Sequence, residues 1–246
     1  MIASKLLSVA LLAGSAIAQN ATIRFMPFGD SITEIICWRA LLWEKLQTTE
    51  YASVNWVGSN NDDEGNCNDA KYNKHNEGHS GFLAINIANN KQLVGWLQAN
   101  PADVITMHLG TNDIVQQNKP VDQIIAAFTT LVGVMRDSNP RMKIIVAQII
   151  PMGLGSYNTA IQNLNNAIPA WAQGLNTTES PIWVVDQYTG FSGTSDLRDG
   201  VHPNMAGDTK MANVWYPAIM NAFAVAAADQ ATLAEEDVKI ATPFTA

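Results

Sequence analysis

The sequence predicts an α/β domain in which a parallel sheet is covered by helices on both faces. Nearly continuous apolar runs of strand length alternate along the chain with longer segments whose apolar residues recur at helical spacing. Strands that are apolar throughout are typical of a sheet buried on both sides. The 246-residue chain shows no internal repeat, linker or appended module, so we expect a single domain.

Five strands are expected, over residues 22–28, 54–57, 104–109, 143–150 and 182–185. Amphipathic helices are expected around residues 35–46, 121–135, 157–171 and 211–222. Residues 58–81 are rich in Asn, Asp and Gly and form a long excursion, which more often serves function than a short loop does. From about residue 227 the chain is Ala-rich and acidic, and we expect a trailing helix or a loosely held tail.

The first 18 residues have the pattern of a secretory signal peptide. Lys5 supplies the positive start, residues 6–13 are apolar, and Ala16–Ala18 matches a small-x-small cleavage site. No later segment approaches 18 uninterrupted apolar residues, so no membrane span is expected. The interpretation is a secreted, extracellular protein whose mature domain covers residues 19–246.

Secretion makes the two cysteines informative. Cys37 and Cys67 are the only pair, and an oxidising compartment favours a disulfide between them, the alternative being two buried thiols. Asn20 and Asn176 begin sequons that accept N-glycans if the host is eukaryotic.

The net charge of −8 and the 14 scattered Lys and Arg residues disfavour binding to nucleic acid. An acidic surface is typical of an extracellular protein that acts on neutral or small substrates, and we expect a monomer.

Four short blocks carry residues with catalytic chemistry. They are Gly29–Ser31, Asn76–Gly81, Gly110–Asp113 and Asp199–Pro203. Together they supply a nucleophile, two amide donors, and a carboxylate three residues before an imidazole, which acyl transfer requires. Three of the four lie at or just beyond the carboxyl ends of predicted strands, where sites form in parallel sheets.

Ser31 is the candidate nucleophile, at a turn from strand to helix where negative charge is stabilised. The alternative is that Ser31 or Thr33 only caps the helix. Thr33 stands where the second glycine of a Gly-x-Ser-x-Gly elbow belongs, which disfavours the lipase-type α/β-hydrolase fold.

His202 is the candidate base. Asp199 precedes it by three residues and can bond its Nδ1, which leaves Nε2 for Ser31. The alternative is that Asp199 and Asn204 are turn and cap residues. His108 lies inside an apolar strand and is expected to be a core histidine satisfied by backbone.

The oxyanion donors are expected to be the backbone N–H groups of Ser31 and Gly81 and the side-chain amide of Asn112. Asp30 and Asp113 are expected to brace their own loops by accepting from backbone amides.

A metal site is the competing interpretation of His75, Glu77 and His79. The glutamate is one position late for an H-E-x-x-H motif, and Gly78 opposes the helix that this motif needs. We therefore expect neither a metal nor another cofactor.

In this order, the four blocks resemble those of the SGNH (GDSL-type) hydrolase superfamily, with Ser31, Gly81, Asn112 and His202 at the signature positions and Asp199 as the acid. The resemblance implies a flavodoxin-like three-layer α/β/α fold with five parallel strands. It also implies esterase chemistry without a metal.

More narrowly, Arg24–Glu34, Cys37–Arg39 and Glu77–Gly81 are similar to carbohydrate esterase family 3. That resemblance implies a secreted acetyl xylan esterase acting on acetylated polysaccharide, with the disulfide near the site and an acid that is sometimes dispensable. The alternatives are a broad short-chain carboxylesterase or lipase, and an inactive carbohydrate-binding relic. The polar segment 116–119 offers no apolar lid for lipid.

Overall fold

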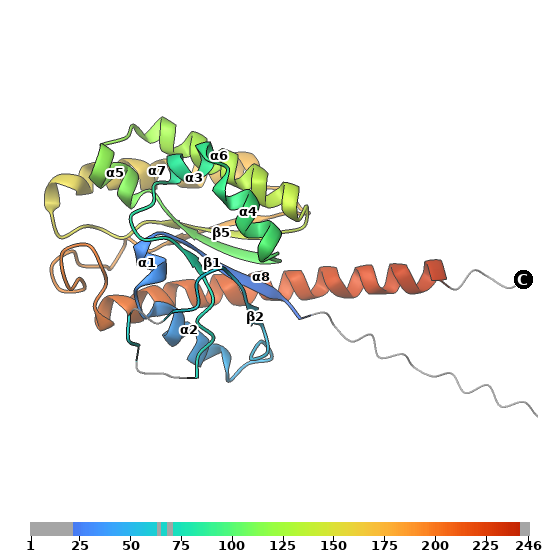
Figure 1. Ribbon diagram of the computed structural model, residues 1–246. Coiled ribbons are helices and arrows are strands. Elements are labelled where there is room, and N and C mark those ends of the chain that lie inside the picture. Colours follow the sequence, from blue (N-terminus) through green and yellow to red (C-terminus); the bar gives the residue numbers. More distant parts are fainter. Residues whose placement is uncertain (1–21, 63–64, 68–70, 242–246) are drawn as a thin grey trace, which may run out of the picture.

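The computed structural model describes residues 22–62, 65–67 and 71–241. The predicted signal peptide and the sequon at Asn20 lie outside the described residues. A central sheet is sandwiched between two layers of helices, which confirms the predicted α/β class (Figure 1).

Within the described residues, the sheet is parallel and has six strands. These are β1 Arg24–Gly29, β2 Asn55–Trp56, β3 Glu77–Gly78, β4 Val104–His108, β5 Lys143–Gln148 and β6 Ile182–Asp186. The order is β2-β1-β4-β5-β6, with β3 beside the carboxyl end of β1. Without β3 this is the flavodoxin-like order, and its direction reverses between β1 and β4, where ligands bind in such sheets.

The expectation of five strands misses β3, which lies in the segment expected to be a polar excursion. Only two residues pair, Glu77 with Phe28 and Gly78 with Gly29, and His79 N then donates to Gly29 O at 3.0 Å. No apolar run marks such a short strand, because its pairing depends on the free edge of β1. The consequence is that residues 76–81 lie directly beside Ser31.

Helices cover both faces of the sheet. One face carries α1 Ser31–Glu34, α2 Trp38–Leu46 and α8 Met205–Ala241. The other carries α3 Ala84–Asn89, α4 Gln92–Ala99, α5 Thr111–Gln117, α6 Val121–Ser138 and α7 Asn158–Leu175, the last preceded by a 3-10 turn at Gly155–Tyr157. Figure 1 shows α3 to α7 above the sheet and α2 and α8 below it.

The helix expected around residues 35–46 begins three residues later than expected: α2 starts at Trp38, and the non-helical residues 35–37 separate it from α1. The short helices α3, α4 and α5 were not expected. Lys91 separates α3 from α4 in a left-handed conformation (φ 53°), so neither is long enough to show helical periodicity.

The strands contribute side chains to two hydrophobic cores, one on each face of the sheet. In β5, Ile144 and Val146 pack under α6 and α7, while Ile145 and Ala147 pack against α8. This alternation within an all-apolar strand is what a sheet covered on both faces requires.

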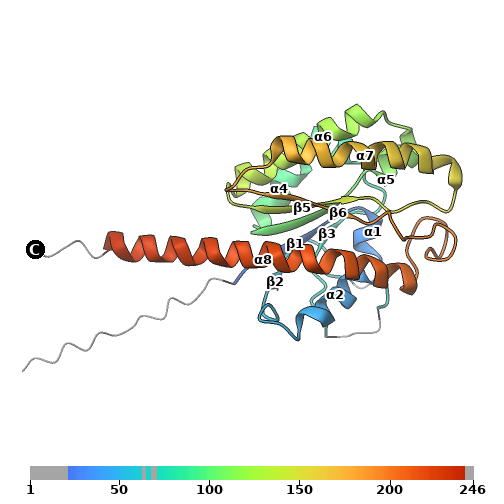
Figure 2. The ribbon, with the colours of Figure 1, turned by 180° about the vertical axis from the view of Figure 1, so that it is seen from behind.

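Helix α8 continues past the body of the domain, as the view from behind shows (Figure 2). It occupies the segment expected from about residue 227 as a trailing helix or a loose tail. Lys143, buried at the start of β5, bonds Asp229 of this helix at 2.6 Å.

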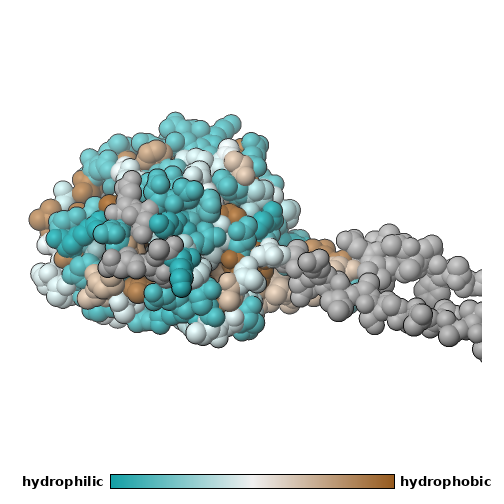
Figure 3. Space-filling model, turned by 60° about the horizontal axis from the view of Figure 1, so that its bottom comes forward, coloured by the Kyte–Doolittle hydropathy of each residue, from teal (hydrophilic) through white to brown (hydrophobic). Residues whose placement is uncertain are grey.

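The outer surface around the α2 side is mainly hydrophilic, with small scattered apolar areas (Figure 3). Among the described residues, no helix combines the length and apolar character needed to cross a bilayer.

Candidate active site

Ser31 is the first residue of α1, and only Asp30 separates it from β1. Asp30 caps this helix, since its Oδ1 accepts from Ile32 N at 2.9 Å. The capping alternative for Ser31 and Thr33 is therefore wrong. In the part of the chain that the structure describes, Ser31 N has no acceptor, so this N–H is free for another one.

The side chains of Ser31, His202 and Asp199 form one chain of hydrogen bonds. Ser31 Oγ lies 2.9 Å from His202 Nε2, and His202 Nδ1 lies 2.8 Å from Asp199 Oδ2. A carboxylate only accepts, so Nδ1 carries the imidazole proton and Nε2 accepts from the serine hydroxyl. This is the geometry of a nucleophile with an oriented general base.

Asp199 also shapes the loop that carries the imidazole. Its Oδ1 accepts from Val201 N at 3.0 Å and from His202 N at 2.8 Å. One carboxylate oxygen therefore organises the turn while the other bonds the imidazole, so the two alternatives for Asp199 coexist. Asn204 caps α8 by accepting from Ala206 N.

Asp199 has a lowered pKa. Partial burial raises it, but the hydrogen bonds from His202 N, the His202 imidazole and Val201 N outweigh burial and lower the pKa to about 2. The carboxylate is thus ionised at neutral pH.

Gly81 follows β3 in a turn with φ 80°, a conformation that glycine adopts without strain. Glu34 Oε2 accepts from Ser80 N at 2.5 Å, and Phe82 N donates to His79 O at 3.1 Å. Within the described chain, Gly81 N has no acceptor.

Glu77 and His79, two of the candidate metal ligands, belong to a hydrogen-bonded network behind this turn. Glu77 is fully buried and bonds Ser59 Oγ at 2.5 Å and His79 Nε2 at 2.7 Å. The His79 ring stacks on Trp96, with centroids 4.0 Å apart. His75 faces away to Gly58 O, and no three potential ligands gather around a common point among the described residues.

Asn112 lies at the start of α5, across the β1–β4 reversal from Ser31. Its Nδ2 is 3.1 Å from Phe82 O and 3.4 Å from Asp30 Oδ2. Asp113 does not brace its own loop as expected but accepts from Ala84 N, at 2.8 Å, at the start of α3.

Two buried groups beneath the site have displaced pKa values. Burial raises the pKa of Asp30 to about 7, opposed by the bond from Ile32 N and assisted by the charge of Asp113. His108 is buried as expected, but the expected backbone partners are missing, since neither ring nitrogen has one among the described residues. Burial lowers the pKa of His108 to about 4 and keeps the ring neutral.

The candidate nucleophile, base and oxyanion donors share one cleft of about 360 Å³. Ser31, Gly81, Asn112 and His202 line it together with the apolar side chains of Ile35, Val115, Met152 and Val201. Gln116 also lines the cleft and was not expected there; its spacing of one helical turn from Asn112 was the available signal. A larger groove of about 430 Å³ between α4 and α6 has no histidine among its lining residues to serve as a base.

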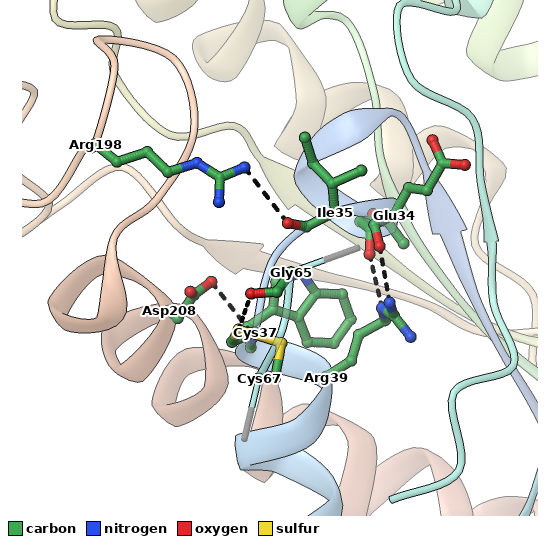
Figure 4. Close-up of a disulfide and its surroundings, with 10 residues drawn as sticks. Glu34, Ile35, Cys37, Arg39, Gly65, Cys67, Arg198 and Asp208 are labelled. Carbon is green, nitrogen blue, oxygen red and sulfur yellow. Dashed lines mark hydrogen bonds between the residues drawn. A yellow bond between two sulfur atoms is a disulfide. The ribbon is translucent and has the colours of Figure 1, made fainter. Parts of the chain in front are cut away.

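The predicted disulfide joins Cys37 and Cys67 beside the start of α2 (Figure 4). Asp208 of α8 accepts from Trp38 N at 3.1 Å at this helix terminus. The disulfide therefore anchors the chain just beyond α1, which carries Ser31. Asn176 is exposed at the end of α7.

A family model for the GDSL-like lipase/acylhydrolase family matches residues 28–210. The match spans all four blocks, and the chain belongs to this family of ester hydrolases. It is a carboxylic ester hydrolase.

Within that class, the chain is similar to carbohydrate esterase family 3. A family 3 esterase from Talaromyces cellulolyticus is 40% identical, with a TM-score of 0.77 over 81% of this chain and 97% of that one. A family 3 esterase from Clostridium thermocellum is 27% identical, with a TM-score of 0.69 over 84% of this chain and all of that one.

A multidomain esterase from Ruminococcus flavefaciens is 28% identical over 218 residues. This alignment covers 79% of the present chain but only 28% of that relative's length.

Proposed function

We propose that this protein is a secreted serine esterase that removes O-acetyl groups from acetylated plant cell-wall polysaccharide, as an acetyl xylan esterase does. The bond from Ser31 Oγ to His202 Nε2, in a cleft shared with three amide donors, carries this proposal. The polysaccharide part rests on the similarity to carbohydrate esterases, and secretion rests on the N-terminal pattern and the disulfide.

In the first half-reaction, His202 Nε2 takes the hydroxyl proton as Ser31 Oγ attacks the acetyl carbonyl carbon. The resulting oxyanion accepts from Ser31 N–H, Gly81 N–H and Asn112 Nδ2. The bond from the carbonyl carbon to the sugar oxygen then breaks, His202 returns the proton to that oxygen, and the sugar hydroxyl leaves acetyl-Ser31 behind.

In the second half-reaction, water replaces the sugar. His202 Nε2 takes a proton from the water as its oxygen attacks acetyl-Ser31. Collapse of the tetrahedral intermediate returns that proton to Ser31 Oγ and releases acetic acid, which loses its remaining acidic proton to solvent as acetate. Asp199 stays ionised throughout, holds the imidazole in the required tautomer and stabilises the imidazolium.

Ser31→Ala tests the mechanism. We expect it to abolish hydrolysis of para-nitrophenyl acetate while the circular dichroism spectrum stays unchanged. Ser138→Ala, an exposed serine at the end of α6, is the matched control and should retain full activity. Undiminished activity in Ser31→Ala would show that the nucleophile is wrong.

Two substrate series test the specificity. Among acetyl, butyryl and octanoyl esters we expect acetyl to react fastest, and a rate that rises with chain length would indicate a lipase or a broad carboxylesterase. Acetate release from a panel of acetylated polysaccharides should be greatest with acetylated xylan. Glycan binding with no hydrolysis would indicate the binding relic, and loss of activity in a chelator would indicate metal chemistry.

A further inference from the structure

Gln116 contacts two of the three residues whose N–H groups the proposed function assigns to the oxyanion, and the inference below rests on that function. Gln116 lies four residues after Asn112 on α5, so the two side chains share one face of the helix. Its Nε2 lies 2.9 Å from Asn112 Oδ1 and 3.0 Å from Gly81 O.

This bonding pattern determines which way each amide faces. Gly81 O is a backbone carbonyl and only accepts, so Gln116 must present its NH₂ group to it. The same group faces Asn112, which must then accept through Oδ1 and is left to donate through Nδ2. Phe82 O, another acceptor, requires the same orientation of Asn112.

The orientation matters because the two ends of the Asn112 amide have opposite effects on an oxyanion. Nδ2 stabilises the negative charge that develops on the carbonyl oxygen, whereas Oδ1 in its place would repel that charge. Gly81 is held in a similar way from both sides, with Glu34 on the preceding N–H and Gln116 on its carbonyl.

We propose that Gln116 is a positioning residue of the oxyanion site. It holds Asn112 Nδ2 and the Gly81 turn in their donating orientations before substrate binds, so that neither must reorganise in the transition state. Gln116 is exposed, and its replacement is therefore expected to change kinetics and leave stability nearly unchanged.

Gln116→Met is the principal test, because methionine keeps the length and helix propensity of glutamine without its donors. On para-nitrophenyl acetate we expect kcat to fall roughly 10- to 30-fold, part of the roughly 10²–10³ that one oxyanion donor supplies, with little change in KM. Gln117→Met, the neighbouring exposed glutamine of α5, is the matched control and should leave kcat unchanged.

Gln116→Glu tests whether the role of residue 116 depends on hydrogen-bond donation or only on the shape of its side chain. A carboxylate matches glutamine in shape but only accepts, and it would face the two acceptor oxygens of Asn112 and Gly81. We expect Gln116→Glu to be slower than Gln116→Met at neutral pH. If the Glu variant is instead closer to wild type, shape matters more than donation and the proposal is wrong.

A double-mutant cycle tests whether Gln116 acts through Asn112. In an Asn112→Ala background, Gln116→Met should lower kcat by less than about threefold, because only the Gly81 contact remains to be lost. An equal effect in both backgrounds would overturn the proposal. If Ser31→Ala is inactive but Gln116→Met matches wild type, only this inference fails; if Ser31→Ala is active, the proposed function fails and this inference with it.

Discussion

Replacing Asp199 with Asn measures how much an exposed acid contributes to the triad. The amide keeps an acceptor oxygen for Val201 N and His202 N, so the loop should keep its shape. The substitution removes the negative charge that faces His202 Nδ1, and it places an N–H where that nitrogen now donates.

The expected loss follows from the distance and the exposure. Nδ1 and Oδ2 are 2.8 Å apart, which places the two charge centres about 4 Å apart. At that separation an ion pair is worth about 1 kcal/mol in water and about 4 kcal/mol near a protein surface. Because the Asp199 side chain is 48% exposed, we take a value of about 2 kcal/mol, or roughly 30-fold in rate.

We therefore expect Asp199→Asn to lower kcat for para-nitrophenyl acetate by about 10- to 100-fold with little change in KM. A triad with a buried acid loses about 10⁴-fold in the equivalent change. Asp186→Asn is the matched control: Asp186 is an exposed acid at the end of β6 that accepts from Tyr188 N and Thr189 N without facing an imidazole. A loss near 10⁴-fold, or none, would refute the screening argument.

Three further outcomes are expected. Asn112→Ala should lower kcat by about 10²–10³ without changing the circular dichroism spectrum, and an unchanged kcat would remove this donor from the mechanism. Cys37→Ser combined with Cys67→Ser should lower the free energy of unfolding in denaturant by about 3–4 kcal/mol, because the disulfide closes a loop with a sequence separation of 30; reduction of the wild type should give the same loss. Burial raises the pKa of Asp208 to about 7, so the folded state binds more protons than the unfolded state from about pH 4 to 7, and stability falls as pH rises through that window. Asp208→Asn should remove up to about 4 kcal/mol of this decline, and parallel stability curves for the two proteins would contradict it.

Several features of this protein follow from local pattern. Apolar runs predict the core of the sheet, because burial on both faces leaves almost no position for a polar side chain. The three-residue spacing of Asp199 and His202 confines both to one loop, so their contact depends little on the rest of the fold. The glycine at position 81 likewise indicates a turn that needs a positive φ.

Other features arise only from contacts between residues that are far apart in the sequence. Ser31 and His202 are 171 positions apart and meet because the strand order brings α1 beside the loop that precedes α8. Strand β3 forms because β1 offers an unpaired edge at its carboxyl end, and β3 in turn places Gly81 next to Asn112 and Gln116. No spacing in the sequence predicts these contacts.

The surroundings of buried polar groups also depend on the tertiary structure. Asp113 binds the start of α3 instead of its own loop, and His108 lacks the partners that its strand was expected to supply. The sequence alone thus determined the five expected strands, the turn at Gly81 and the types of reactive side chain, which are set by interactions between near neighbours. The tertiary structure decided which of those side chains meet, how their amides face and where their pKa values lie, because those properties depend on desolvation and on hydrogen bonds between segments far apart in the chain.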